Sequence, residues 1–304
     1  MALKDFPGVK QQIPLKLYST FRVGGPADYF YSARDVESFL KISSEAKSEN
    51  CRIFVLGNGS NVLFLDEGFR GLVIKMEMTG LEIKEDRLIA EAGATWPSIL
   101  KVAEKAGLSG LEEMSGLPGT LGGAVCGNAG CFGKEMAQLV ESALLYDPLS
   151  GKTKEVDQNY FNFRYRWSRL KETHEIVLRV TLKLKNRSHE GKKSDISLDN
   201  AGKQTLTSFA SERAKKQPPG FSSGSFFKNP SPEKPAGLLI DQCGLKGFRV
   251  GGAQISPKHA NFFINTGMAS AQDLLSLRDQ VKKSVFDRFQ IALEEEVIIV
   301  KNNP

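Results

Sequence analysis

The first half of the chain alternates short apolar segments with amphipathic ones. Residues 52–56 and 71–75 are rich in β-branched side chains, which is typical of strands. Residues 34–47 predict a helix, because their apolar side chains recur at the spacing of one helix face. These apolar positions are Val36, Phe39, Leu40 and Ala46. Residues 96–107 favour a second helix, with a proline in the first turn and a glycine after the last.

The second half has one long polar interruption. Residues 175–185 alternate apolar and polar side chains, as in a half-buried strand. Residues 186–204 contain only three aliphatic side chains, and we interpret them as a flexible linker or mobile loop. Beyond them the pattern predicts two helices and two strands, at about 235–243, 270–289, 261–265 and 297–300. Ser270 followed by Asp273 is a cap signal for the last helix.

Composition narrows the class of protein. A chain of 304 residues is long enough for two domains, and 40% apolar with 25% charged residues is ordinary for a globular protein. The net charge of +6 favours solubility or a basic site for an acidic ligand such as a nucleotide or carboxylate. Long Lys/Arg runs with interleaved aromatic residues are absent, which argues against a nucleic-acid groove.

The sequence also indicates the cellular location of the protein and whether it binds a metal. The N-terminal residues lack the apolar core of a signal peptide, and no apolar run reaches membrane-spanning length. Four cysteines and three histidines are too scattered to suggest a metal site or a disulfide framework. We therefore expect a protein of the reducing cytoplasm, without a metal and without a membrane or nucleic-acid partner; the oligomeric state stays open.

A glycine-rich turn follows the strand at 52–56. The sequence VLGNGSNVL (55–63) nearly matches the dinucleotide fingerprint, but Val62 stands where a third glycine is required. No P-loop motif occurs in the chain. Gly57 and Gly59 allow close approach of the backbone, so that successive N–H groups can surround an anion. The alternative is a tight turn without a ligand.

A second glycine cluster spans residues 107–133 and contains nine glycines in 27 residues. A solvated linker would be rich in serine and charge, whereas this segment carries large apolar residues among its glycines: Leu117, Leu121, Val125 and Phe132. We therefore expect an ordered backbone packed against something close, such as a cofactor ring or a pyrophosphate. A glycine-rich packed turn is the alternative.

The segment SSGSFFKNP (222–230) has the residue types of a reaction site. Ser225 offers a hydroxyl that can give or take a proton, and Gly224 permits close approach. Lys228 and Asn229 add a charge and an amide nearby. These residues alone do not identify a reaction.

Seven motifs occur in a characteristic order between about residues 15 and 300. They are STFRVGGPA (19–27), LGNGSNVL (56–63), SGLPGTLGGAVCGNAGCFG (115–133), FRYRWS (163–168), GSFFKNP (224–230), LIDQCGLKGFRVGGAQISPKHANFFIN (239–265) and LEEEV (293–297). Together they resemble the UDP-N-acetylenolpyruvoylglucosamine reductase family, the flavoenzymes of peptidoglycan synthesis. Each motif alone is modestly specific, but seven motifs in the same order make a chance resemblance very unlikely.

The resemblance implies an α+β fold of the vanillyl-alcohol-oxidase type, with two FAD-binding subdomains and a third, substrate-binding domain. We accordingly expect an FAD-binding domain at 1–185, divided into subdomains of roughly 15–75 and 76–185. The polar segment 186–204 would connect it to an α+β substrate-binding domain at 205–304.

The resemblance also implies an activity. The family reduces the enolpyruvyl ether of UDP-N-acetylglucosamine to UDP-N-acetylmuramate, with NADPH as reductant and non-covalent FAD delivering hydride from its N5 atom. The implied partners are therefore small molecules, NADPH and a UDP-sugar.

Three catalytic residues carry over from the family motifs. The arginine falls on Arg166, where a fixed cationic fork can stabilise negative charge building on the substrate carboxylate. The serine falls on Ser225, as proton donor to the carbanion. The glutamate falls on Glu296, acting with Arg166 either as a protonated hydrogen-bond donor or by positioning it; Glu294 and Glu295 leave its register uncertain. The alternatives are a surface arginine, a turn serine and a solvated carboxylate.

Cofactor contacts are expected within the two glycine clusters, at Gly57, Asn58, Gly59, Ser60, Asn61, Ser115, Gly116, Pro118, Gly119, Thr120, Gly123, Ala124 and Asn128. Substrate contacts are expected at Lys216, Lys228, Asn229, Gln254 and His259. For His259, a buried structural histidine is the competing interpretation.

Two departures from the family pattern have consequences. Some members carry a tyrosine on a mobile loop over the substrate, but residues 186–204 contain none, which predicts the shorter family form with a more open site. Some members place a basic residue two positions after the glutamate, where this chain has Ile298. Phosphate contacts are therefore expected elsewhere.

Two other functions compete with the reductase. One is an oxidase of the same fold acting on a sugar or alcohol, often with flavin tethered through histidine or cysteine; Cys126 and Cys131 leave room for that. The other is a non-catalytic nucleotide-binding protein, which would not require Arg166, Ser225 and Glu296 together.

Overall fold

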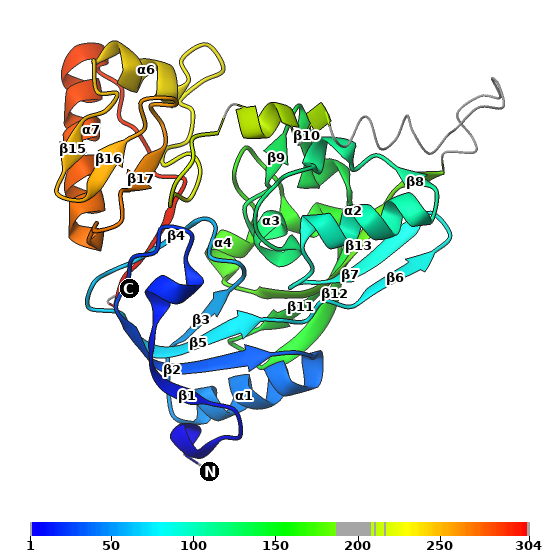
Figure 1. Ribbon diagram of the computed structural model, residues 1–304. Helices are drawn as coiled ribbons and strands as arrows, with labels where there is room; N and C mark the ends of the chain where they lie inside the picture. Colours follow the sequence, from blue (N-terminus) through cyan, green and yellow to red (C-terminus); the bar gives the residue numbers. More distant parts are fainter. Residues whose placement is uncertain (1, 187–207, 210, 216, 303–304) are drawn as a thin grey trace, which may run out of the picture.

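In the described residues, sheets of four, five and three strands, three two-stranded pairs and the helices packed against them make up the α+β fold (Figure 1). The computed structural model describes residues 2–186, 208–209, 211–215 and 217–302. The first sheet contains four strands, in the order β1 (Lys10–Pro14), β2 (Pro26–Ala33), β5 (Phe69–Met76) and β3 (Ile53–Leu56). Strands β2, β5 and β3 are parallel, and β1 is antiparallel to β2. Figure 1 shows α1 (Val36–Ser48) along the outer side of this sheet.

The second sheet is antiparallel and has five strands. Their order is β12 (Lys152–Asp157), β11 (Val140–Asp147), β13 (Ile176–Lys183), β7 (Arg87–Glu91) and β6 (Leu81–Lys84). The helices α2 (Trp96–Lys105) and α3 (Leu121–Cys126) share one apolar core with it. The same core contains Leu72 and Ile74 of β5 and Phe39 of α1, so the two sheets are joined into one body.

Short elements complete the first 186 residues. The two-stranded pairs are β8 (Leu108–Ser109) with β14 (Lys185–Asn186), and β9 (Gly130–Cys131) with β10 (Lys134–Glu135). A one-turn helix, α4, spans Leu170–Thr173. The 3₁₀ helices are η1 (Leu3–Asp5), η2 (Leu15–Tyr18), η3 (Glu112–Met114), η4 (Met136–Gln138) and η5 (Gln158–Phe161).

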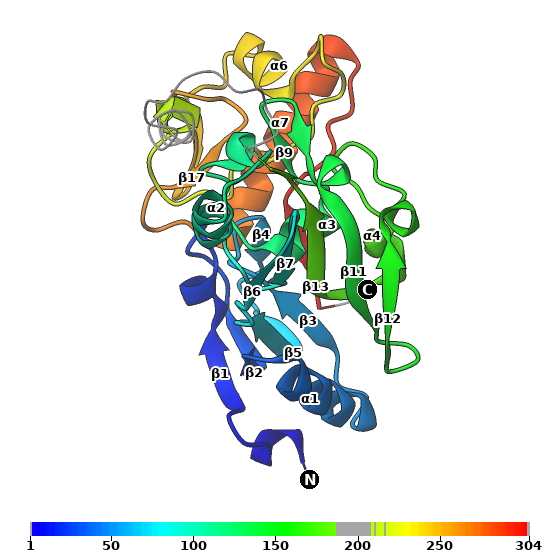
Figure 2. The ribbon, with the colours of Figure 1, turned by 90° about the vertical axis from the view of Figure 1, so that its right-hand side faces the viewer.

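The C-terminal unit packs a small antiparallel sheet against two helices, as Figure 2 shows from the side. Its elements are α6 (Ala236–Gln242), β15 (Arg249–Val250), β16 (Ala253–Ile255), β17 (Phe263–Asn265) and α7 (Ala271–Phe289). Phe226 lies at the centre of its core, stacked on Phe263 with ring centroids 4.2 Å apart. The N-terminus of α7 is capped by a reciprocal pair, Ser270 and Asp273, as the sequence predicts.

The last strand returns to the first sheet's side of the molecule. Strand β18 (Ile298–Val300) pairs in parallel with β4 (Val62–Phe64), and Figure 1 shows the two together. Phe21 and Leu63, from the N-terminal part, are buried in the core of the C-terminal unit. The turn before β4 and the segment before β18 are therefore neighbours.

The elements predicted from the hydrophobic pattern are confirmed, most of them with shorter bounds, whereas the strand expected at 71–75 is the longer β5 and the helix expected at 34–47 ends one residue later, as α1. The strand expected at 175–185 is β13, and the strand expected at 261–265 is β17. The helix expected at 96–107 is α2, whose proline lies in its first turn. The polar segment 186–204 lies outside the described residues except for Asn186.

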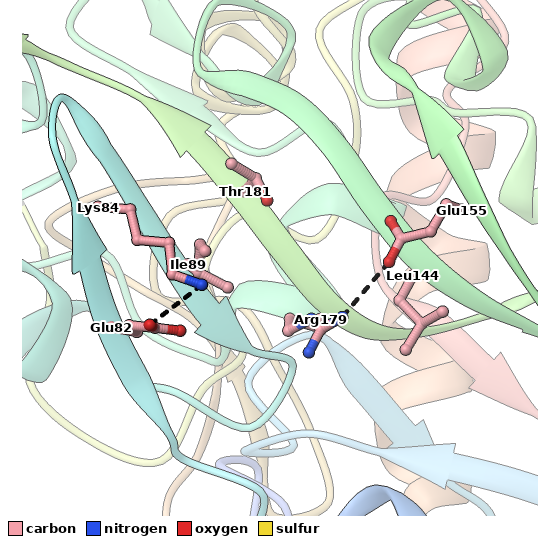
Figure 3. Close-up of a pocket in the computed structure, with 7 residues that line it drawn as sticks. All are labelled: Glu82, Lys84, Ile89, Leu144, Glu155, Arg179 and Thr181. Carbon is pink, nitrogen blue, oxygen red and sulfur yellow. Dashed lines mark hydrogen bonds and ion pairs between the residues drawn. The ribbon is translucent and has the colours of Figure 1, made fainter.

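The outward face of the five-stranded sheet has a hollow of about 140 Å³ (Figure 3). Two ion pairs line it, Lys84–Glu82 at 3.1 Å and Arg179–Glu155 at 3.3 Å between nitrogen and oxygen. None of the predicted site residues lines this hollow. In the described part of the chain, no helix is both long and apolar enough to span a bilayer, and no three acidic, histidine or cysteine side chains gather as metal ligands would.

Candidate active site

The turn 57–61, which follows β3, has a conformation that requires glycine. Gly59 has φ +63°, and a Cβ there would lie 2.0 Å from the carbonyl oxygen of Tyr18. The backbone N–H of Thr20 donates to the carbonyl of Gly59 over 3.0 Å, which fixes the turn against the preceding segment. The close approach expected from the sequence is therefore an approach to the protein's own backbone at this position.

The two glycine clusters lie against each other, although they are some sixty residues apart. Asn58 Nδ2 donates to the carbonyl of Gly119 over 3.4 Å. A Cβ on Gly57 would lie 2.5 Å from Thr120 Oγ1, and a Cβ on Gly119 would lie 2.8 Å from Ser60 Oγ. Side chains at these glycines would fill the space between the two segments.

Backbone N–H groups without hydrogen-bond partners lie along the first glycine cluster. Within the described part of the chain, the backbone N–H groups of residues 58–61 make no hydrogen bond. Successive N–H groups without partners suit a diphosphate, because each can donate to a phosphate oxygen. Of the remaining predicted cofactor residues, Ser115, Gly116 and Pro118 lie in the segment leading into α3, and Gly123 and Ala124 lie within that helix.

Lys75 of β5 supports the turn 57–61, a role that the sequence did not predict. Its Nζ donates to the carbonyl of Gly57 over 2.7 Å and to Asn58 Oδ1 over 3.1 Å. Burial lowers the pKa of Lys75, with Glu77 opposing the shift. A lysine within the apolar run GLVIKM is the sequence signal that marks it.

Asn128 shapes the second glycine-rich cluster. It has φ +42° and is buried. Its Nδ2 donates to Glu135 Oε2 and to the carbonyl of Arg164, each over 2.9 Å, and its Oδ1 accepts the N–H of Ala137. The side chain is committed to internal bonds.

Arg166 forms an ion pair with Glu296. It occupies a tight turn with φ +53°, between Arg164 and Trp167, whose backbones bond to each other. Its Nε lies 2.9 Å from Glu296 Oε1, while its Nη1 donates to the carbonyl of Gly130 over 3.2 Å. The guanidinium and the carboxylate therefore form a close ion pair. Both side chains are about three-quarters buried, at 24% and 21% exposed.

Burial and the neighbouring positive charges shift the pKa of Glu296 in opposite directions. Burial raises the pKa of Glu296, and the positive charges of Arg166, Lys171 and Lys228 counteract that rise. Lys171, in α4, was not predicted; its Nζ donates to the carbonyl of Arg166 over 2.8 Å. Burial lowers the pKa of Lys171. A carboxyl group that holds its proton more readily than usual thus lies beside a fixed cation.

The three neighbouring glutamates have different partners. Glu294 pairs with Lys228 at 2.9 Å, and Glu295 pairs with Lys282 of α7 at 3.0 Å. Only Glu296 among these three contacts Arg166 in the described structure. The register expected from the sequence motif agrees with this geometry.

Ser225 lies on the strand-like segment beside Glu296. The carbonyl of Phe226 accepts the N–H of Glu296 over 2.8 Å, and Ser225 forms an isolated bridge with Phe262. In the described residues the hydroxyl of Ser225 has no hydrogen-bond partner, and the side chain is partly exposed. Gly224, before it, has φ +75° and open space where a Cβ would stand. The three predicted catalytic residues are thus brought to one region.

A cavity of about 190 Å³ adjoins this region. It is lined by Cys131, Phe132, Arg213, Gln217, His259 and Phe262. Phe262 is the bridge partner of Ser225, and Cys131 follows the glycine whose carbonyl binds Arg166. Burial lowers the pKa of His259, and its Nδ1 accepts the N–H of Asn261 over 3.3 Å. The cavity therefore offers an arginine, a neutral imidazole and aromatic surface.

The other predicted substrate residues have varied surroundings. Asn229 Oδ1 accepts the N–H of Ala236 at the start of α6, and its own N–H donates to the Tyr165 hydroxyl. Gln254 Nε2 donates to the carbonyl of Gly247 over 3.3 Å, and no described contact joins it to the Arg166–Glu296 pair. Lys216 lies outside the described residues.

Two family models match the chain. Residues 216–300 match the UDP-N-acetylenolpyruvoylglucosamine reductase C-terminal domain, and residues 27–157 match an FAD binding domain. A UDP-N-acetylenolpyruvoylglucosamine reductase of Clostridioides difficile is 39% identical over 295 residues, covering 96% of this chain and 93% of the relative. UDP-N-acetylenolpyruvoylglucosamine reductase 2 of Symbiobacterium thermophilum is 36% identical, covering 99% of this chain and 95% of the relative.

A solved structure shares the whole fold. It is a UDP-N-acetylenolpyruvylglucosamine reductase from Thermus caldophilus, with a TM-score of 0.81 and 36% sequence identity. The similarity covers 96% of this chain and 99% of that one.

Proposed function

The chain belongs to the UDP-N-acetylenolpyruvoylglucosamine reductase family, and we propose that Arg166, Ser225 and Glu296 carry out its reaction. That reaction is the NADPH-dependent reduction of UDP-N-acetylglucosamine enolpyruvate to UDP-N-acetylmuramate in peptidoglycan synthesis, with FAD as cofactor. The observation that supports the residue assignment is the Arg166–Glu296 pair, with Ser225 on the adjacent strand-like segment.

The facing glycine clusters would hold FAD. The unpartnered N–H groups of residues 58–61 would donate to its diphosphate, and the segment 115–120 would close the other side. Lys75 keeps the first cluster in shape through its bonds to Gly57 and Asn58. When bound, FAD supplies the hydride that it has received from NADPH.

Arg166 would stabilise the charge that develops on the substrate. An enol ether is electron-rich, so its reduction depends on spreading negative charge onto the conjugated carboxylate. The guanidinium of Arg166 is held by Gly130 and Glu296, which restricts its orientation. A donor held in place before the reaction stabilises a transition state at little reorganisation cost. Glu296 would keep Arg166 oriented and, when protonated, donate a hydrogen bond to the substrate.

Ser225 would supply the proton that completes the reduction. One alkene carbon takes a hydride and the other takes a proton, so the substrate gains two hydrogens and no net charge. The Ser225 hydroxyl is partly exposed and without a partner in the described residues, which leaves it free to donate. Gly224 leaves open space beside it for the substrate. The proton that Ser225 loses would be replaced from solvent.

The substrate would occupy the cavity next to Ser225. Arg213 there offers a cation for the diphosphate, and the aromatic rings offer surface for the sugar and base. His259 would enter as a neutral hydrogen-bonding group, because burial lowers its pKa. Lys228, Asn229, Gln254 and Lys216 remain proposed contacts, with Lys228 required to exchange its partner Glu294 for substrate.

The domain limits and location are also proposals. We place an FAD-binding domain at 1–185, in subdomains of about 15–75 and 76–185, and a substrate-binding domain at 205–304. The division is supported by two apolar cores, one confined to residues up to Leu184 and one made mainly by the C-terminal unit, with Phe21, Val23 and Leu63 added from the N-terminal part. We further propose the shorter family form, a cytoplasmic location, and no nucleic-acid or membrane partner.

The first experiment separates the two half-reactions. The purified protein is mixed anaerobically with NADPH until the flavin absorbance bleaches, and the enolpyruvyl nucleotide is then added. Rapid return of the oxidised band is expected. A flavoprotein that stays bleached until oxygen is admitted would instead be an oxidase-like relative, and a protein that binds no FAD would overturn the assignment of both glycine clusters.

A further inference from the structure

The cofactor turn is hydrogen-bonded directly to the segment that carries Glu296. Asn61 Nδ2 donates to the carbonyl of Glu296 over 3.1 Å. The carbonyl of Asn61 accepts the N–H of Ile298 over 3.0 Å. Asn61 therefore holds the chain on both sides of Val297, across 235 residues of sequence.

A second connection runs to the segment that carries Ser225. Thr20 Oγ1 lies 3.2 Å from the carbonyl of Gly59 and 3.0 Å from Ser223 Oγ. Ser223 is buried and precedes Ser225 by two residues. One threonine hydroxyl thus joins the cofactor turn to the serine segment.

We propose that Asn61 and Thr20 are positioning residues, which hold Glu296 and Ser225 in a fixed place relative to the cofactor turn. The side-chain amide of Asn61 donates to the backbone of Glu296, while its backbone N–H remains among the groups proposed to contact FAD. The inference rests on the proposed roles of Glu296 and Ser225. It adds two residues whose side chains contact neither the Arg166 and Glu296 side chains nor the cavity.

The position of Glu296 depends on its hydrogen bond from the Asn61 side chain. Its N–H is held by Phe226 and its carbonyl by Asn61. The charged groups facing its carboxylate are Arg166, Lys171 and Lys228. Without the amide of Asn61, the Glu296 side chain gains freedom to leave Arg166, and displacements of about 1 Å can cost about a hundredfold in rate.

The test compares Asn61→Ala with Asn58→Ala, because both asparagines lie in the same turn and only Asn61 contacts the C-terminal unit. For each holoenzyme, flavin reoxidation by the enolpyruvyl nucleotide is measured in single turnovers at saturating FAD, over a range of pH. The FAD dissociation constant is measured separately by flavin fluorescence. Asn58→Ala is expected to weaken FAD binding, and Asn61→Ala to slow reoxidation about ten- to a hundredfold.

The pH profile distinguishes positioning from general damage. Separating Glu296 from Arg166 weakens the attraction that opposes the burial-induced rise of its pKa, so the limb governed by Glu296 should move to higher pH in Asn61→Ala. Reoxidation by Asn61→Ala within twofold of wild type overturns the inference, and so does slower reoxidation with an unchanged pH profile. Wild-type protein that fails to reoxidise would instead overturn the proposed function.

Thr20 provides a second, nearly isosteric test. Thr20→Val removes the hydroxyl and keeps the shape, whereas Thr20→Ser keeps the hydroxyl. Reoxidation is expected to fall about tenfold in the valine variant and to stay within about threefold of wild type in the serine variant. Equal rates in the two variants would overturn the role of Thr20, even if Asn61→Ala failed to fold.

Discussion

Replacing Glu296 by glutamine tests the charge at the centre of the proposed site with little change of shape. Glutamine keeps the length of the side chain and its hydrogen-bonding capacity but removes the negative charge that faces Arg166. The backbone bonds of Glu296 to Phe226 and Asn61 do not depend on its side chain. The segment is therefore expected to keep its place in the variant.

The distance between the charges sets the size of the effect. Two unit charges 2.9 Å apart attract by about 6 kcal/mol at an effective dielectric constant of about 20. Desolvation of both ions offsets much of this, and each side chain is still partly exposed, which leaves a net coupling of about 2–3 kcal/mol. If that coupling orients Arg166 in the transition state, Glu296→Gln slows reoxidation about a hundredfold.

Single-turnover reoxidation of prereduced enzyme is the assay, and Glu294→Gln is the matched control. Glu294 lies two residues away and is exposed, so its bond to Lys228 is a surface ion pair with little energetic weight. The control is expected within about threefold of wild type. Equal rates for Glu296→Gln and wild type would refute the role of the pair, and a larger loss in Glu294→Gln would move the catalytic glutamate to that position.

Three further outcomes are expected. Ser225→Ala slows reoxidation by the enolpyruvyl nucleotide about 10²–10⁴-fold while NADPH still bleaches the flavin at the wild-type rate, since only the proton donor is lost. Lys75→Met raises the FAD dissociation constant about tenfold in a fluorescence titration, because the turn loses its tether; unchanged affinity would contradict this. Burial alone would raise the pKa of Glu175, but hydrogen bonds from Lys154, Tyr160 and Thr173 outweigh it and hold the pKa below its ordinary value of 4.5. That stabilisation is present at neutral pH and is lost as the pH falls through the lower, folded-state pKa. Glu175→Gln should therefore have a lower melting temperature than wild type at pH 7, and wild type should lose more thermal stability than the variant below pH 4.5. Parallel pH dependence of the two melting temperatures would contradict this role of Glu175.

Much of the fold follows from local patterns in the sequence. The stripe of apolar residues along α7 and its Ser270–Asp273 cap predict that helix because spacing and capping are local properties. The pairing of β18 with β4 is different, since it joins residues more than two hundred positions apart. No periodicity in either strand indicates its partner.

Sequence motifs predict which residue types form the candidate site, but they do not predict how these residues come together. Composition identifies both glycine clusters, but only the fold shows that Gly57 packs against Thr120 and Gly119 against Ser60. Lys171 carries no local signal, because a lysine in a short polar helix is ordinary. Its importance arises from burial next to Arg166, which is a property of the packed structure.

The three consecutive glutamates show where sequence reasoning ends. Side chains of an extended segment alternate between two faces. Leu293 and Val297 are buried in the C-terminal core, and Glu295, on the same face, pairs with Lys282 of α7. Alternation alone therefore separates Glu295 from its neighbours once the two apolar residues are taken as core. It does not separate Glu294 from Glu296, because these share a face and differ only in whether Lys228 or Arg166 lies opposite, which depends on the long-range register set by Phe226 and Asn61.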